Sequence, residues 1–221
     1  MPRSRSRRPR ASARATLALA LVAASGCNHY RPTQTGYLGD YSRLEKDPFH
    51  INHGIGFQRA RTRDATHEAA GAIDSFSIEP VEWLVDPASR AGQTPGRREA
   101  LSASLDEALR DQLGRLRPIV DRPGPRTARI RSAITTVRLS RPILNVLLTA
   151  TYFTPLAIGP VFFGGGAVEA EAIGPDGRQL AAVTSASSGG WIDLIGFYSR
   201  SGHAHKAMRR NAKELREALD H

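Results

Sequence analysis

The chain has 221 residues, with 31 basic and 21 acidic residues and a formal net charge of +10. Six arginines lie within residues 1–14, which contain no acid, so the remaining 25 basic and 21 acidic residues give a net charge of only +4. This balance is ordinary for a folded domain and excludes a strongly basic nucleic-acid-binding protein. The single cysteine excludes an internal disulfide.

Residues 1–26 have the order of a bacterial lipoprotein signal peptide. A basic start is followed by an apolar run over residues 15–24 and then by the small residues Ser25 and Gly26. The run is shorter than the about 20 apolar residues needed to span a bilayer and matches a signal peptide. Cys27 comes next and is the predicted lipidation site. An ordinary secretory signal with an incidental cysteine is the alternative.

Lipid chains on Cys27 would hold the protein on a membrane, since each buried CH₂ contributes about 0.8 kcal/mol. Asn28 occupies the sorting position, where asparagine rather than aspartate favours the outer membrane over retention at the inner membrane. We therefore expect a protein of the cell envelope, lipid-anchored at the outer membrane and facing the periplasm.

Residues 27–72 show no sustained periodicity and are predicted to be a tether with ordered patches. His50, His53 and His67 lie within it. Two histidines at this spacing, without a fixed acidic or cysteine partner, are typical of loop residues rather than of a metal site. We expect no metal and no cofactor.

A folded domain is predicted over residues 73–221. Residues 73–86 alternate as a strand whose apolar parity shifts after Pro80, as at an edge or a bulge. Residues 97–114 form a helix, with leucine at every fourth position, and residues 117–121 form a short strand. The leucines of this helix are Leu101, Leu105, Leu109 and Leu113.

Three further strands and a helix complete the domain. Residues 127–139 predict a half-buried strand, in which every second residue from Ala128 to Thr136 lies on the same face. Residues 166–173 and 178–187 predict a hairpin around a Pro-Asp-Gly turn. Residues 202–220 predict the closing helix. The order favours an α+β fold, a single mixed or antiparallel sheet of about five strands with two helices on one face.

The catalytic motifs that we considered do not match. Glu169 and Glu171 alternate in a strand and are expected on a solvated face, because a catalytic pair must flank a cleft. The glycines at 164–166 lack the Lys-Ser/Thr of a phosphate loop and are expected to open the next strand. No nucleophile-elbow motif is present, so we expect no enzyme.

Residues 143–163 carry no charge. Pro155, Gly159 and Pro160 interrupt the segment, which favours a bridging element between strands over a membrane span. Val161, Phe162 and Phe163 form a candidate interaction surface for a partner or for the membrane.

Two stretches resemble a known family of bacterial lipoproteins, the domain of unknown function 3313. Residues 35–44, TGYLGDYSRL, resemble the family's opening motif SGFLSDYSRL. Residues 142–145, PILN, and residues 168–171, VEAE, resemble its KPVLN element and its acidic strand before a turn. The resemblance covers most of residues 35–220 and implies an envelope-anchored protein. It carries no catalytic residue and no established activity.

These observations favour a non-enzymatic accessory or assembly partner of an envelope protein complex, held to the membrane by its N-terminal lipid. A small-ligand or lipid-binding lipoprotein that uses residues 143–163 is the alternative, and an envelope hydrolase is the third. A flat or exposed apolar face would favour the first and a dry apolar cleft the second. A pocket with a perturbed acid or histidine would favour the third.

Overall fold

The computed structural model describes residues 32–46, 55–61, 72–140, 143, 164–188, 199 and 201–220. Seven strands form one sheet: β1 (Glu45–Lys46), β2 (Ile55–Arg61), β3 (Ser75–Ile78), β4 (Glu82–Trp83), β5 (Thr127–Arg138), β6 (Gly165–Ile173) and β7 (Gln179–Ser188). The helices are α3 (Pro95–Leu113) and α6 (Gly202–Leu219). None of the described helices is long and apolar enough to cross a bilayer.

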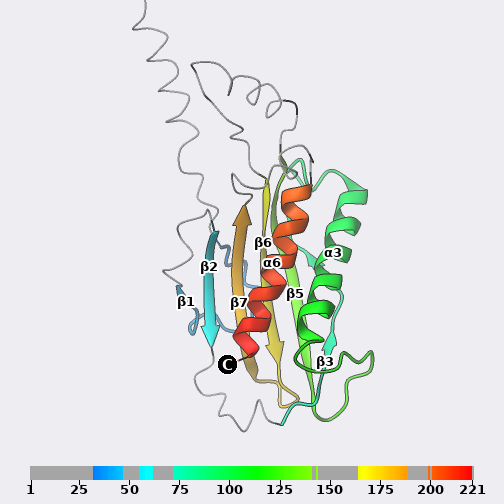
Figure 1. Cartoon of the computed structure of the whole chain (residues 1–221). Coiled ribbons are helices and arrows are strands. Elements are labelled where there is room, and N and C mark those ends of the chain that lie inside the picture. Colours follow the sequence, from blue (N-terminus) through cyan, green and yellow to red (C-terminus); the bar gives the residue numbers. More distant parts are fainter. Residues whose placement is uncertain are drawn as a thin grey trace, which may run out of the picture.

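The sheet is mixed, in the order β1-β2-β7-β6-β5-β3. The neighbours from β1 to β5 pair antiparallel, whereas β3 and β4 both run parallel to β5. Both helices pack on the same face of the sheet (Figure 1). The predicted α+β fold with two helices on one face is confirmed.

The main apolar core lies between this sheet face and the helices. The four leucines of α3 are fully buried, as their spacing predicts. The facing parts of β6, β7 and α6 are built largely from alanine and valine, including Ala170, Val183, Ala207 and Ala212. These small side chains let α6 approach the sheet closely: a Cβ on Gly166 would meet the Met208 Cε at 2.4 Å.

Two irregularities modify the predicted strands. The strand is interrupted at Pro80. β3 precedes this proline and β4 follows it, and the two pair with successive parts of β5, as the change of parity predicts. A bulge in β5 between Ile134 and Thr136 shifts the register. Val137, rather than Thr136, therefore joins the helix-side core.

The structure also differs from the expected boundaries. The predicted strand 117–121 is present only as a bridge from Ile119 to Phe76. Conversely, β1 and β2 lie within the predicted tether, and β2 pairs with β7 from Ile55 to Arg61. Strand pairing of this kind is made by backbone hydrogen bonds, which side-chain periodicity does not report.

Candidate functional site

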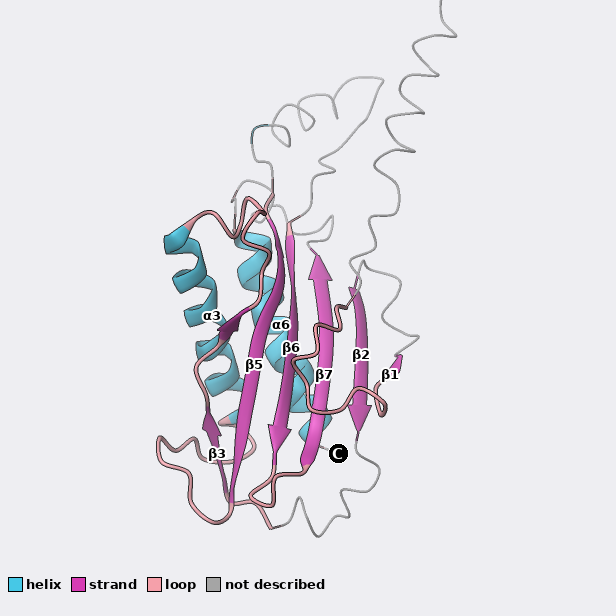
Figure 2. Ribbon diagram, turned by 180° about the vertical axis from the view of Figure 1, so that it is seen from behind, coloured by secondary structure: helices cyan, strands magenta, loops and turns pink. Residues whose placement is uncertain are grey.

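Residues 32–44, hereafter the strap, cross the sheet face opposite the helices and lead into β1 (Figure 2). The strap has no regular secondary structure but several fixed turns. Gly36 has φ +87°, a conformation that L side chains rarely adopt. The Asp40 carboxylate accepts hydrogen bonds from the Ser42 backbone N–H and hydroxyl at 2.8 and 2.7 Å. These local contacts set the path of the strap before it meets the sheet.

Glu169 and Glu171 point from β6 beneath the strap, and both are 0% exposed. The expectation that they lie on a solvated strand face is wrong. The reason is tertiary: β6 is an interior strand between β5 and β7, with helices on one face and the strap on the other. Carboxylates in such a position must find hydrogen-bond donors, because burial of an unpaired charge is costly.

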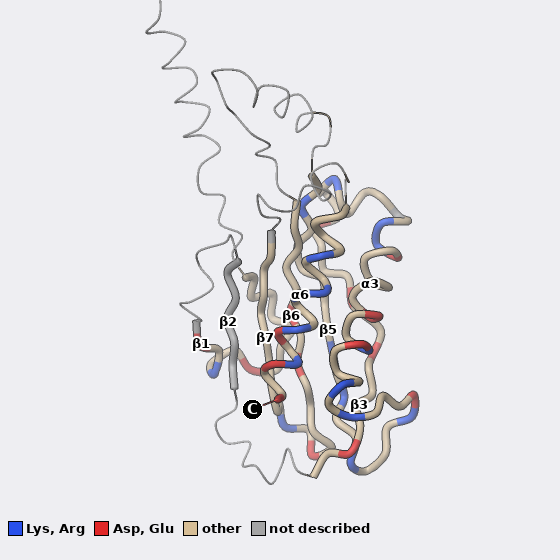
Figure 3. Tube along the Cα trace, in the orientation of Figure 1, with Lys and Arg blue, Asp and Glu red and all other residues tan. Residues whose placement is uncertain are grey.

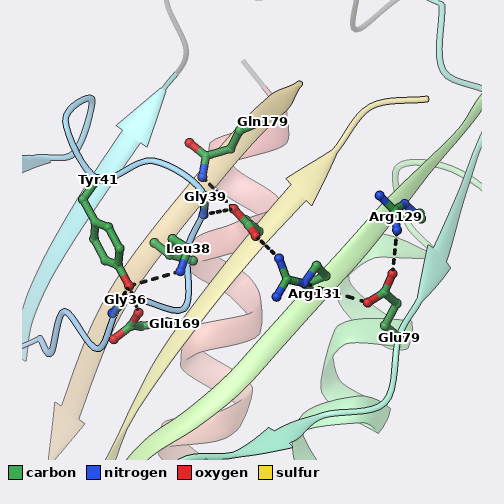
Figure 4. A network of polar contacts seen from close by, with 10 residues as sticks. Gly36, Leu38, Gly39, Tyr41, Glu79, Arg129, Arg131, Glu169 and Gln179 are labelled. Carbon is green, nitrogen blue, oxygen red and sulfur yellow. Dashed lines mark hydrogen bonds and ion pairs between the residues drawn. The ribbon is translucent and has the colours of Figure 1, made fainter. Parts of the chain in front are cut away.

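Glu169 takes its donors from the strap (Figure 4). The Thr35 backbone N–H donates to Glu169 Oε1 at 2.8 Å, and the Tyr41 hydroxyl donates to Oε2. The same hydroxyl accepts the backbone N–H groups of Gly36 and Leu38 at 3.0 and 3.1 Å. Tyr41 thus joins three points of the strap to one buried carboxylate.

Glu171 combines strap and sheet donors. Gly39 N–H and the Gln179 amide donate to Oε2 at 2.9 and 2.7 Å. The Arg131 guanidinium donates to Oε1 at 3.0 Å and lies over the Tyr37 ring, 4.8 Å from its centroid. The charge of Glu171 is therefore neutralised by a partly exposed arginine that also contacts the strap.

A second acid extends this ion-pair network toward solvent. The Glu79 carboxylate lies 3.3 Å from the Arg129 guanidinium and 3.9 Å from that of Arg131 (Figure 4). These groups are half-exposed, so the outer pairs contribute less than the buried contact with Glu171.

Both strap tyrosines are held in their neutral form. Burial, reinforced by the hydrogen bond to Glu169, raises the pKa of Tyr41. Burial raises the pKa of Tyr37 well above its usual range, and the negative charge of Glu82 adds to this effect. A neutral phenol is required at Tyr41, because the group donates its proton to Glu169.

The arrangement is a latch between the strap and the sheet. We define the strap latch as Glu169, Glu171, Arg131 and Tyr41 together with the strap. The carboxylates of Glu169 and Glu171 already accept hydrogen bonds from the strap. Among the described residues, no group of three or more His, Cys, Asp or Glu side chains is placed to hold a metal ion.

A separate polar contact lies on the helix side. His203, buried in the first turn of α6, accepts the Gly164 N–H on Nδ1 at 3.2 Å and contacts Ser140 Oγ at 2.9 Å. His203 therefore joins Ser140, which follows β5, to Gly164, which comes directly before β6. As predicted, β6 begins within the glycines at 164–166.

The remaining predicted site residues lie outside the described residues: Cys27, Asn28, His50, His53, His67, Val161, Phe162 and Phe163. Sequence reasoning placed Glu169 and Glu171 on one strand face but missed their burial. The sequence carried one partial signal: the acids alternate with alanine and valine in a strand that other predicted strands precede and follow in the chain. It did not show which strands lie beside this one in the sheet, so the cover over the acids could not be predicted.

The matching family model is "Protein of unknown function (DUF3313)", over residues 33–215. The chain belongs to this family. No curated protein matches the sequence significantly. Two solved structures of PelC dodecamers from Paraburkholderia phytofirmans are similar. The first, a variant, has 11% identity and a TM-score of 0.43 and covers 73% of this chain and 97% of that chain. The second has 13% identity and a TM-score of 0.40, with 65% and 89% covered.

Proposed function

We propose that this member of the DUF3313 family is a membrane-anchored envelope lipoprotein and a non-enzymatic accessory or assembly partner of an envelope protein complex. The predicted signal peptide and Cys27 place its anchor at the N-terminus, and Asn28 favours the outer membrane. The strap latch is the observation that carries the proposal.

The latch supports the proposal because it joins the chain next to the predicted anchor to the centre of the sheet. Thr35, the first strap residue bound by Glu169, follows Cys27 by eight residues. A pull on the anchor would therefore reach an interior strand through buried, charge-assisted hydrogen bonds. Such bonds are shorter and stronger than neutral ones. In this proposal, the connection keeps the folded domain close to its membrane anchor.

A non-enzymatic role is supported by the occupancy of the buried acids. General acid–base catalysis needs a carboxyl group within hydrogen-bond reach of a substrate proton. Glu169 and Glu171 are covered by the strap and bind its backbone instead.

The test has two parts in the same cells. Metabolic labelling with palmitate compares the wild-type chain with Cys27→Ser, and we expect label and membrane fractionation only with Cys27. In-cell crosslinking and affinity purification then compare the same two proteins, and we expect one stoichiometric envelope complex with the anchored form alone.

Absence of palmitate from the wild-type protein would overturn the anchor. Recovery of labelled protein without any companion would overturn the assembly role. A small molecule detected with that solitary protein by native mass spectrometry would support the ligand-binding alternative, whose candidate surface is Val161 to Phe163.

A further inference from the structure

We infer that one end of the fold, the end at which β5 finishes and both helices begin, is a docking surface for anionic phospholipid headgroups. We call it the basic end. The inference rests on the proposed membrane anchoring, and it adds which surface of the protein faces the bilayer and what chemistry that surface recognises.

Both helices and the central strands define this end (Figure 1). The start of α6 lies there, because His203 contacts Ser140 and Gly164 beside the Arg138–Gly165 pair. The start of α3 lies there too, since β4 leads into it after pairing with Ile134 of β5. Neither helix has an acidic residue in its first turn. The positive ends of two helix dipoles therefore point the same way without acidic side chains beside them.

Exposed cations reinforce this potential. Figure 3 shows lysine and arginine along α6 and at the start of α3. Among the described residues, the acids of this end are Asp86 and Glu99. Among the described residues, the exposed basic residues of this end are Arg90, Arg98, Arg138 and Lys206, whereas Arg209 and Arg210 lie near the middle of α6.

The opposite end has a different charge pattern. There Arg126 pairs with Asp74 at 2.7 Å, and Arg178 pairs with Asp176 at 2.5 Å. By contrast, within the described part of the chain the side chains of Arg90, Arg98 and Arg138 at the basic end form no ion pair. At the far end Arg115, Arg126 and Arg178 each pair with an aspartate, whereas the exposed Arg117 and Arg122 form no ion pair among the described residues. The described cations of the basic end outnumber its acids, so the molecule is more positive at that end. Its attraction to an anionic surface is therefore directional.

The length of the segment between Cys27 and the sheet also indicates that the basic end faces the membrane. The Thr33 hydroxyl is 2.6 Å from that of Thr135, in the last third of β5. Cys27 and Thr33 are six positions apart in the chain, and this stretch spans at most about 22 Å when extended. The end of β5 is about 10 Å beyond Thr135, whereas its start at Thr127 is about 26 Å away. Cys27 can therefore reach the basic end but not the far one.

Vesicle binding of the Cys27→Ser full chain, which cannot carry the predicted lipid, tests the surface apart from the anchor. Vesicles contain phosphatidylethanolamine with either phosphatidylglycerol or phosphatidylcholine. Arg98→Glu/Arg138→Glu should weaken the partition onto phosphatidylglycerol vesicles by about tenfold or more. Arg122→Glu/Arg178→Glu makes the same change in charge at the far end and should weaken it much less. All these proteins share one N-terminal segment, so its contribution cancels in the comparison.

A label provides a second readout that leaves the arginines intact. In the cysteine-free Cys27→Ser chain, an environment-sensitive fluorophore is placed at Gln93→Cys, at the basic end, or at Asp121→Cys, at the far end. We expect only the Gln93 label to respond to phosphatidylglycerol vesicles, with the response decreasing as salt is added.

Equal losses from the two charge reversals, or equal responses from the two labels, would overturn the inference and indicate unspecific attraction. Binding that does not depend on phosphatidylglycerol would overturn it as well. The acyl chain is absent from these assays. A failure here therefore leaves the proposed anchor standing, and a wild-type chain without palmitate overturns the anchor alone.

Discussion

The helix-covered face of the sheet and the strap-covered face are both buried, but by different kinds of contact. On the helix face, leucine, isoleucine, valine and alanine pack against one another. On the strap face, Glu169 and Glu171 bind backbone N–H groups and a phenol. Apolar packing is non-directional and depends on area and volume. Hydrogen bonding to a buried carboxylate depends on each donor being in place.

The helix face therefore stabilises the whole domain, whereas the strap face holds the strap in its place on the sheet. Losing apolar volume should destabilise the whole domain, whereas losing one donor or acceptor should release the strap first. Hydrogen exchange separates the two outcomes, because local opening and global unfolding have different free energies.

The largest effect is expected on the helix face. Leu109→Ala removes a fully buried side chain and should lower the free energy of unfolding by about 2–5 kcal/mol. The same change at Leu84, which is 41% exposed, should cost less than about 1 kcal/mol. Chemical denaturation measures both, and equal losses would contradict the assignment of the core.

A smaller and more local effect is expected on the strap face. Glu169→Gln replaces an acceptor oxygen by an NH₂ group and leaves either Thr35 N–H or the Tyr41 hydroxyl without its acceptor. The cost should be about 1–3 kcal/mol, with amide exchange increasing over residues 33–41 before the rest of the sheet. Glu99→Gln, the same change on an exposed site of α3, should have no such effect. Uniform loss of protection would contradict a latch.

The hydroxyl of Tyr41 is expected to contribute somewhat less. Tyr41→Phe removes one donor and an acceptor shared by two N–H groups, which should cost about 1–2 kcal/mol. The matched Tyr37→Phe keeps the ring beneath Arg131, and the Tyr37 hydroxyl has no hydrogen bond to the described residues. We expect almost no change there, and the reverse order would contradict the role assigned to Tyr41.

Alkaline pH should act on the same face. The pKa of both tyrosines is raised in the folded protein, so their contribution to stability is complete below pH 10 and is lost as pH rises beyond it. The denaturation midpoint should therefore begin to fall near pH 10 and continue to fall as the pH rises further. The fall should be shallower when Tyr37 and Tyr41 are both phenylalanine; an unchanged slope would contradict the raised pKa values.

The smallest effect is expected at the surface. Asp106→Asn removes the carboxylate that lies 2.8 Å from the Arg110 guanidinium on an exposed part of α3. Exposed pairs of this kind contribute about 0.3–0.5 kcal/mol, so the unfolding midpoint should hardly move. A loss comparable with that of Glu169→Gln would remove the distinction between buried and exposed charge.

The sequence alone determined the elements that a periodic pattern marks. The four leucines predicted α3, the Pro-Asp-Gly turn predicted the β6–β7 hairpin, and the parity change at Pro80 predicted the break between β3 and β4. In each case the residues that carry the signal are close together in the chain. The same holds for the family, which the motif at residues 35–44 indicated.

Only the tertiary structure decided that β2 joins the sheet, that β5 bulges before Val137, and that Glu169 and Glu171 are buried. Period-2 alternation says that the two acids share a face, but not what covers that face. Thr35 and Glu169 are 134 residues apart in the chain, and their contact exists only because the folded sheet lies beneath the strap.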